Sequence, residues 1–384
     1  MTDRANISGQ ATRIEGRRRV LHFVTGGFSG ATQVAVDLAL AALQSPHIEP
    51  LLVLRRKRNT EAARVQALRD QGLQVWVVPG WSHLATVWAL ARLCRVLRPA
   101  VLVAHGFPEH LLGRFAGLWA GLWTGLGAGV PKLVQVEHNS RERYSSWRLA
   151  QARWLSRRSA KLVAVSEGVR QRLLELGMPP ALTLAIPNGI ALDRFAAAGD
   201  HPFAQREAGL VMSARFARQK DQLTLIRALQ VLKRRGLSPT LRLAGAGKAS
   251  YRRTAEAEVA KLGLVDQVQF LGHFSQMPQL LMSQQICVLA THYEGMPLAL
   301  VEGMAAGCAC VASLVPGVEG LLVEGETGLL VPEADPIALA DALERVLRDP
   351  LLGARLGANA RERALAEHGV ALMTQRYEDL FLSL

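Results

Sequence analysis

Two glutamates within a short segment of glycine and apolar residues have the chemistry to bind hydroxyl groups. Glu294 and Glu302 are separated by seven residues in the stretch EGMPLALVEGMAAG, which spans residues 294–307. A carboxylate can accept hydrogen bonds from two neighbouring hydroxyls, so Glu302 is suited to hold a ribose. Glu294 lies ahead of the helical pattern, where we expect it to meet the hydroxyls of a sugar.

The pattern around these glutamates predicts a strand, a loop and a short helix. The apolar run 286–290 predicts a buried strand. Pro297 fits the first turn of the helix, because its missing N–H is not needed there, and Gly307 fits the helix end. At the carboxyl edge of a parallel sheet, such a helix start directs unpaired N–H groups and a positive dipole end into the crevice. The segment therefore predicts a phosphate site.

Short apolar runs alternate with helical patterns along most of the chain. Such runs, separated by helices, indicate parallel sheets that are covered on both faces. Two series of them predict an α/β protein with two doubly wound, Rossmann-like domains that face each other across a cleft. The expected strands are 20–25, 50–54, 74–78, 101–105, 133–137 and 162–166, then 210–214, 241–244, 268–271, 286–290, 310–312 and 329–331.

The sequence divides into a tail, two domains and a terminal helix. Residues 1–16 are polar and lack periodicity, so we expect a disordered tail; they also lack the apolar core of a secretory signal. The two domains are expected at 17–190 and 205–368, with a turn signal at Pro187-Asn188-Gly189 near the boundary. Residues 369–384 predict an amphipathic helix that returns to the first domain.

The net charge of +13 lies entirely in the first half of the chain. Residues 1–200 contain 26 Lys and Arg against 13 Asp and Glu, whereas the remaining residues contain 19 of each. A one-sided basic surface attracts nucleic acid, anionic lipid or a phosphorylated glycan. No recognition helix, zinc finger or RNA-binding motif accompanies the charge, so a nucleic-acid partner is not expected.

One region of the first half has the composition of a membrane interface. The run 115–130 is uncharged but shorter than the roughly 20 residues of a spanning helix, so we expect a core or interfacial helix. The basic, tryptophan-bearing segment that follows suits anionic headgroups, although a solvated helix with inward-facing tryptophans fits equally well. Its residues are Trp147, Arg148, Arg153, Trp154, Arg157, Arg158 and Lys161.

Taken together, these motifs resemble the signature of the family-4 retaining glycosyltransferases, which have the GT-B fold. The two glutamates and their setting are the most specific part, and other stretches follow in the order typical of the family. They are GG at 26–27, VSE at 165–167, IPNGI at 186–190, SAR at 213–215, KD at 220–221, AGAG at 244–247 and FLG at 270–272. The likeness extends from about residue 18 to the end, and implies an acceptor domain followed by a nucleotide-sugar domain.

The resemblance implies roles for individual residues. Arg215 and Lys220 would bind the diphosphate of a UDP- or GDP-linked sugar, and Glu302 the ribose. His138, with Glu294, would lie at the reacting carbon, whereas His105 is expected to be structural. The donor-binding residues would be Arg215, Lys220, Gly245, Gly295, Met296, Pro297, Leu298 and Glu302. The acceptor or phosphate loop would hold Gly26, Gly27 and Gly30, and neither a metal nor a cofactor is expected.

The resemblance also implies sugar transfer to a glycan or glycolipid acceptor, typical of lipopolysaccharide or other surface polysaccharide synthesis. We expect a cytoplasmic enzyme with peripheral contact to an anionic membrane. Ser213 and Ala214 depart from the family's usual glycine, and Asp221 replaces another. Two alternatives stay open: a nucleotide-sugar epimerase of the same fold, and a non-catalytic nucleotide-sugar-binding subunit at the membrane.

Overall fold

The computed structural model describes residues 16–28, 30–122, 131–141 and 144–384. All of the expected tail except Gly16, and the part of the uncharged run from 123 to 130, lie outside the described residues. The expectation of a core or interfacial helix is therefore not addressed by the structure for that part of the run.

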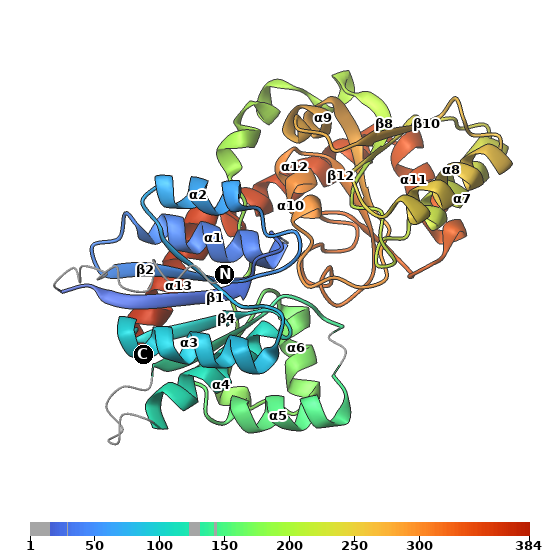
Figure 1. Cartoon of the computed structure of the whole chain (residues 1–384). Helices are drawn as coiled ribbons and strands as arrows, with labels where there is room; N and C mark the ends of the chain where they lie inside the picture. Colours follow the sequence, from blue (N-terminus) through green and yellow to red (C-terminus); the bar gives the residue numbers. More distant parts are fainter. Residues whose placement is uncertain (1–15, 29, 123–130, 142–143) are drawn as a thin grey trace.

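Two parallel sheets organise the chain (Figure 1), one of seven strands in the order β3-β2-β1-β4-β5-β6-β7 and one of six in the order β10-β9-β8-β11-β12-β13. The expected α/β fold with two domains is confirmed. The first sheet comprises β1 Arg18–Thr25, β2 Ile48–Arg55, β3 Gln74–Val78, β4 Val101–His105, β5 Lys132–Glu137, β6 Lys161–Ala164 and β7 Thr183–Ala185. The second comprises β8 Glu207–Ser213, β9 Leu241–Ala244, β10 Val268–Gly272, β11 Gln284–Leu289, β12 Ala309–Ser313 and β13 Leu329–Val331.

Strand β7 was not expected from the sequence. Its three residues are too short a run to show a pattern, and they follow a 3-10 turn at Pro180–Leu182. The strand exists because β6 offers it a free edge: Leu162, Val163 and Ala164 pair with Thr183, Leu184 and Ala185. Pairing along a sheet edge is a tertiary event that a local pattern does not report.

Helices follow nearly every strand, and many begin at a capping side chain. Ser82, Ser145, Ser166, Asp221, Asp335 and Asp349 each accept a hydrogen bond from a backbone N–H of the first turn. The first-half helices are α1 Gly30–Ala42, α2 Ala62–Asp70, α3 His83–Leu97, α4 Glu109–Leu122, α5 Ser146–Ser156 and α6 Glu167–Glu175. Those that follow are α7 Gln222–Arg234, α8 Ala249–Lys261, α9 Met277–Ser283, α10 Leu298–Ala305, α11 Pro336–Arg348, α12 Pro350–Glu367 and α13 Val370–Ser383.

The side chains of β1 show how the first sheet is covered on both faces. Leu21 and Phe23 pack in the cluster formed with α3 and α4, whereas Val20 and Val24 pack with residues of α1. Alternate residues of a strand point to opposite faces of the sheet. Because helices cover both faces, all four of these side chains are fully buried. This explains why apolar residues occupy positions on both faces of the strand, at Val20, Leu21, Phe23 and Val24, with His22 between them.

Helix α13 returns to the first domain, as expected, and runs behind β1 and α1 in Figure 1. Its apolar face, which includes Tyr377 and Phe381, is buried. Arg18 donates a hydrogen bond of 2.6 Å to the carbonyl of Phe381, and the hydroxyl of Ser45 donates one of 2.6 Å to Glu378. Helix α13, which follows the second domain in the chain, therefore connects that domain to the first by packing and hydrogen bonds.

Among the helices that the structure describes, none combines the length and the apolar character needed to cross a bilayer. Helix α4 contains the described part of the uncharged run and packs against α3 and β4. Arg114, which flanks that run, is fully buried in this helix.

Candidate active site

Glu294 lies in the loop between β11 and α10, and its carboxylate is almost completely buried. It accepts hydrogen bonds from the ammonium of Lys220, from the hydroxyl of Thr291 at 2.7 Å and from the amide of Gln219 at 3.2 Å. A buried carboxylate needs such partners to remain charged. The Glu294 carboxylate is thus held in one position.

The segment after β8 brings the two predicted phosphate-binding cations to this carboxylate. Lys220 pairs with Thr291 through an isolated antiparallel bridge, which fixes its backbone beside the Glu294 loop. Arg215 is exposed, and its guanidinium donates to the side-chain oxygen of Gln219 at 3.3 Å. Gln219 therefore links Arg215 to Glu294. Gln219 and Thr291 were not predicted, because an isolated polar residue in a loop gives no sequence signal of its partner.

Helix α10 begins one residue later than predicted. Pro297 is the N-cap with extended backbone angles, and the helical residues start at Leu298. The helix ends as expected: Gly307 has a φ of +73°, and the N–H groups of Gly307 and Cys308 bond to the carbonyls of Met304 and Gly303. The start of α10 follows Glu294, Gly295 and Met296 directly, so the helix's unpaired N–H groups lie beside the glutamate loop.

Glu302 is positioned differently from Glu294. It lies within α10, and its ion-pair partner is Arg194, at 3.6 Å, in the connecting segment between the sheets. Burial raises the pKa of Glu302, and the Arg194 charge opposes that shift. The structure brings Arg215, Lys220 and Glu294 into one connected group, and places Glu302 with Arg194.

His138 directly follows β5 and is the outer member of a row of three histidines. Its Nε2 lies 3.2 Å from Nδ1 of His105, whose Nε2 lies 3.0 Å from Nδ1 of His22. Burial lowers the pKa of His22 to about 3 and that of His138 to about 4, and holds the pKa of His105 well below its usual value. All three rings are therefore neutral at pH 7.

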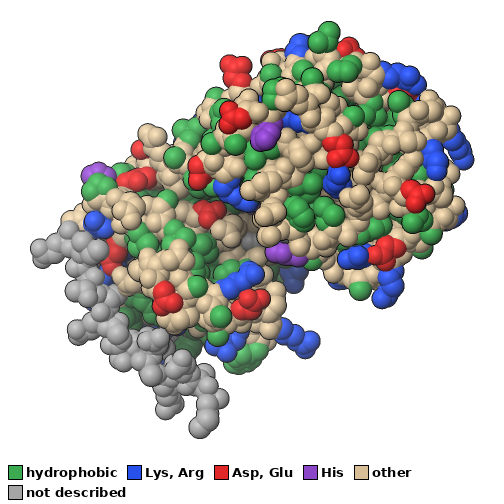
Figure 2. All heavy atoms as spheres, turned by 90° about the horizontal axis from the view of Figure 1, so that it is seen from above, with side chains coloured by type: hydrophobic (Ala, Val, Ile, Leu, Met, Phe, Trp, Pro, Cys, Tyr) green, Lys and Arg blue, Asp and Glu red, His purple; other side chains and the backbone are tan. Residues whose placement is uncertain are grey.

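The two domains meet where these groups lie. A Cβ on Gly295 would collide with the His138 carbonyl, so the loop that carries Glu294 packs directly against the residue after β5. The hydroxyl of Ser166 donates to the Gly295 carbonyl at 2.7 Å, and Met296 sulfur accepts from the N–H of Asn188 at 3.1 Å. Charged and histidine side chains are visible where the two lobes adjoin in Figure 2.

The predicted glycines have separate structural reasons. A Cβ on Gly26 would lie 2.6 Å from the Thr60 hydroxyl, whereas Gly30, at the start of α1, has open space around it. A Cβ on Gly27 would lie 3.5 Å from Asn59, in ordinary contact. Gly245 has a φ of +146°, and a Cβ there would collide with the Ala214 carbonyl. Gly245 thus allows the close backbone approach that positions the residue after Ala214, which is Arg215.

A buried polar network beneath His138 was not predicted. Tyr144 donates from its hydroxyl to Glu137 at 3.3 Å and lies 2.9 Å from Nε2 of His110. Arg114 donates to the His110 carbonyl at 2.9 Å, and burial lowers the pKa of Arg114 to about 10. The network supports Glu137, the residue before His138. The network could not be predicted from sequence patterns, because its residues come from three separate segments: β5, α4 and the segment before α5.

The four cysteines, Cys94, Cys287, Cys308 and Cys310, are free and buried. Among the described residues, no group of three or more His, Cys, Asp or Glu side chains is arranged to hold a metal ion.

Comparison with known proteins assigns both halves of the chain. Residues 28–194 match the model described as glycosyltransferase family 4, and residues 193–363 match the model described as glycosyl transferases group 1. The chain therefore belongs to the family-4 glycosyltransferases, and the resemblance that the sequence motifs indicated is confirmed.

Individual relatives agree with this assignment. The putative glycosyltransferase EpsD of Bacillus subtilis is 29% identical over 56% of this chain, and the match spans 58% of its own length. An Escherichia coli UDP-Gal:alpha-D-GlcNAc-diphosphoundecaprenol alpha-1,3-galactosyltransferase is 24% identical over 79% of this chain and 80% of its own. The structure of Anabaena HepE in complex with UDP and glucose superimposes with a TM-score of 0.79 at 20% identity, covering 96% of this chain and all of that one.

Proposed function

We propose that this glycosyltransferase moves a sugar, with retention of anomeric configuration, from a nucleotide sugar to a glycan or glycolipid acceptor. The observation that carries the proposal is the group formed by Lys220, Gln219 and Glu294 beside the start of α10, in contact with the His138 backbone through Gly295. Together with Arg215, which donates to Gln219, it unites cations for a diphosphate, a fixed carboxylate for sugar hydroxyls and a neutral imidazole.

In the proposed reaction, the bond between the donor's anomeric carbon and its phosphate oxygen breaks, and the electron pair leaves with the nucleoside diphosphate. Arg215, Lys220 and the N–H groups of α10 stabilise the charge that develops there, without a metal ion. The acceptor hydroxyl oxygen forms the new bond to the anomeric carbon, and its proton passes to the departing diphosphate oxygen. His138, neutral at pH 7, is able to accept a hydrogen bond from the sugar or the acceptor.

For the donor, the structural relative HepE, whose structure is a complex with UDP and glucose, supports a uridine nucleotide. For the acceptor, the E. coli relative is named for transfer onto a diphosphoundecaprenol-linked sugar. The basic charge of residues 1–200 agrees with an anionic glycolipid. We therefore propose a role in lipopolysaccharide or other surface polysaccharide synthesis, at the cytoplasmic face of the membrane.

The test is an assay of donor consumption and product mass, with UDP- and GDP-linked sugars and candidate lipid-linked acceptors. Acceptor-dependent transfer with an α-linked product from an α-linked donor is expected. Donor conversion without any acceptor would favour an epimerase instead, and donor binding without turnover across the acceptor panel would favour a non-catalytic subunit. An inverted linkage in the product would contradict the proposed stereochemistry.

A further inference from the structure

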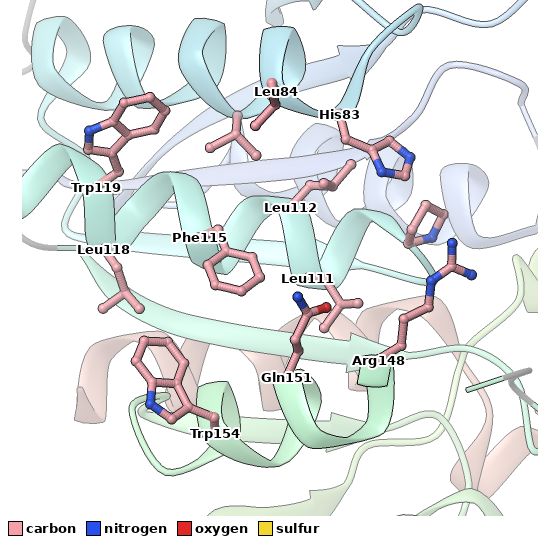
Figure 3. Close-up of a pocket in the computed structure, with 12 residues that line it drawn as sticks. His83, Leu84, Leu111, Leu112, Phe115, Leu118, Trp119, Arg148, Gln151 and Trp154 are labelled. Atoms are coloured by element: carbon pink, nitrogen blue, oxygen red, sulfur yellow. The ribbon is translucent and has the colours of Figure 1, made fainter. Parts of the chain in front are cut away.

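The first domain contains an apolar groove between α3, α4 and α5 that the proposed chemistry does not use. Its volume is about 490 Å³, within the roughly 300–1,000 Å³ typical of ligand sites. Figure 3 shows side chains from the three helices pointing into it. They are His83, Leu84 and Val87 of α3, Pro108 before α4, Leu111, Leu112, Phe115, Leu118 and Trp119 of α4, and Arg148, Gln151 and Trp154 of α5.

The groove is amphipathic along its length. In Figure 3, Arg148 and His83 lie at one end, Leu118, Trp119 and Trp154 lie at the other, and Phe115 lies between them. The Arg148 end is also where α3, α4 and α5 begin, and the starts of α3 and α5 add positive dipole ends to the guanidinium. Helix α4 begins with Glu109, whose carboxylate is buried and paired with Arg55 and Lys57. The shape and polarity fit a hydrocarbon chain whose anionic head lies at the cationic end.

The cationic end is close to the candidate active site. Pro108 belongs to the segment that follows β4, two residues after Gly106, and a Cβ on Gly106 would lie 3.9 Å from the ring of His138. The Arg148 guanidinium lies over the ring of Phe107, 5.4 Å from its centre. A head group bound at Arg148 would therefore present its attached sugar toward His138.

The charge of the surrounding surface favours an anionic amphiphile. Neither α3 nor α5 contains an acidic residue, and both carry arginines. Large apolar side chains stand exposed on the same helices: Leu84 is 78% exposed, and Trp88, Trp147 and Trp154 are also exposed. Exposed apolar side chains beside arginines are typical of surfaces that contact lipid.

We infer that this groove binds the hydrocarbon chain of a lipid-phosphate acceptor, with the phosphate at Arg148 and the chain over Phe115 and Trp119. The inference rests on the proposed function, because it assigns the lipid part of the acceptor proposed there. It adds a binding site and a substrate class: a sugar joined through phosphate to a hydrocarbon chain.

The probe for the test is dodecyl phosphate, used below the concentration at which it forms micelles and titrated calorimetrically into the full chain. Saturable binding is expected, at least about tenfold tighter than that of inorganic phosphate or dodecyltrimethylammonium, since each lacks one of the two recognised parts. Equal binding of all three, or no binding of dodecyl phosphate, would overturn the inference.

Two variants locate the site, and a third is their matched control. Gln151→Trp fills the groove and Leu84→Asp places a negative charge on its wall, so each should weaken dodecyl phosphate binding by roughly tenfold or more. Leu351→Asp makes the same change at an equally exposed leucine of the second domain, 83% exposed, and should bind as the wild type does. Unchanged binding in both groove variants would refute the assignment.

A parallel measurement separates this inference from the proposed function. The shift in melting temperature produced by UDP reports on the donor site, which lies in the second domain. If dodecyl phosphate does not bind as expected but UDP still raises the melting temperature, the lipid site is refuted and the proposal of glycosyl transfer is unaffected. Loss of the UDP shift in the wild type would count against the donor proposal instead.

Discussion

At the scale of single residues, the site depends on the partners that surround one buried carboxylate and compensate its charge. Glu294 has Lys220, Gln219 and Thr291 around it, and each of these comes from a loop that follows a strand of the second sheet. Donor phosphate would compete with Glu294 for the Lys220 ammonium. Such competition would allow donor binding to release the carboxylate toward the sugar hydroxyls.

Lys220→Ala should lower kcat/KM on the order of 100-fold, because it removes a cation that, in the proposed reaction, stabilises the leaving diphosphate. The measurement is steady-state transfer with the donor identified by the assay above. Lys233→Ala removes an exposed lysine of α7, whose ammonium binds only a carbonyl, and should leave kcat/KM unchanged. Near-wild-type transfer by the Lys220 variant would exclude Lys220 from the site.

The histidine row predicts a pH dependence of stability. The pKa of His22 is about 3 in the folded protein against 6.5 in the unfolded chain, so below pH 6.5 the unfolded state binds more protons. The stability contributed by a neutral His22 is therefore complete above pH 6.5 and is lost as the pH falls toward 3. The loss from this residue should approach about 1.4 kcal/mol per pH unit.

Urea midpoints at pH 7.5, 6.0 and 5.0 test this dependence. His22→Gln should show a flatter decline than the wild type, because the substituted side chain does not titrate. His273→Gln, at an exposed histidine, should retain the wild-type slope. Parallel declines in the wild type and His22→Gln would show that the buried ring does not control acid stability.

At the scale of elements, the loop between β11 and α10 positions the chemistry by packing against the other domain. Gly295, Met296 and Pro297 are buried, and the loop contacts the segments after β5 and β6. Gly317, in the loop after β12, also packs against Glu294, since a Cβ there would lie 2.5 Å from the Glu294 carbonyl oxygen. Small residues at these points permit three backbone segments to approach closely.

Gly295→Ala should reduce kcat/KM on the order of 100-fold, because the added methyl would displace the Glu294 loop from His138, and misplacement by about 1 Å has that scale of effect. Gly199→Ala provides the control, since a Cβ there meets nothing within 4 Å. Circular dichroism should show both variants folded. Full activity in the Gly295 variant would mean that close contact between the domains is unnecessary for transfer.

At the scale of the whole molecule, the charge is divided between the domains. The basic excess belongs to residues 1–200, whose described part contains the sheet and the groove, whereas the charges of the later residues cancel. On α5 the Trp147 and Trp154 rings are exposed, and the Arg158 guanidinium lies 3.8 Å above the Trp154 ring centre. The Trp147 ring therefore does not pack inward, whereas Trp154 is partly exposed and also stacks on Phe115 in the groove. The exposure of Trp147 favours the interfacial interpretation of this helix.

Arg157 and Arg158, replaced together by alanine, should weaken binding to anionic vesicles by roughly tenfold or more, at about 1 kcal/mol for each arginine near the surface. Sedimentation with anionic and neutral vesicles, at low and high salt, measures this. The wild type should bind anionic vesicles more strongly than neutral ones, and this binding should weaken as the salt concentration rises. A double replacement of Arg234 and Arg253 in the second domain is the control. Equal recovery with both kinds of vesicle would contradict membrane contact.

The sequence alone determined the alternation of strands and helices, and the strand-loop-helix around Glu294. Buried parallel strands need apolar runs, and a helix end like that at Gly307 needs a residue that tolerates positive φ. Each of these requirements concerns a short stretch of the chain, so it can be recognised from the residue types of that stretch. Arg215 and Lys220 were suggested by the resemblance to the family's motifs after the first strand of the second domain, and their role stays a prediction.

Only the tertiary structure decided which distant residues meet. His22, His105 and His138 form one row because β1, β4 and β5 are neighbours in the sheet, and the order of strands is set by pairing that no local pattern encodes. The groove likewise exists only because α3, α4 and α5 cover the same face. Gln219 and Tyr144 acquired Glu294 and His110 as partners in this way, since these contacts join residues that are far apart in the chain.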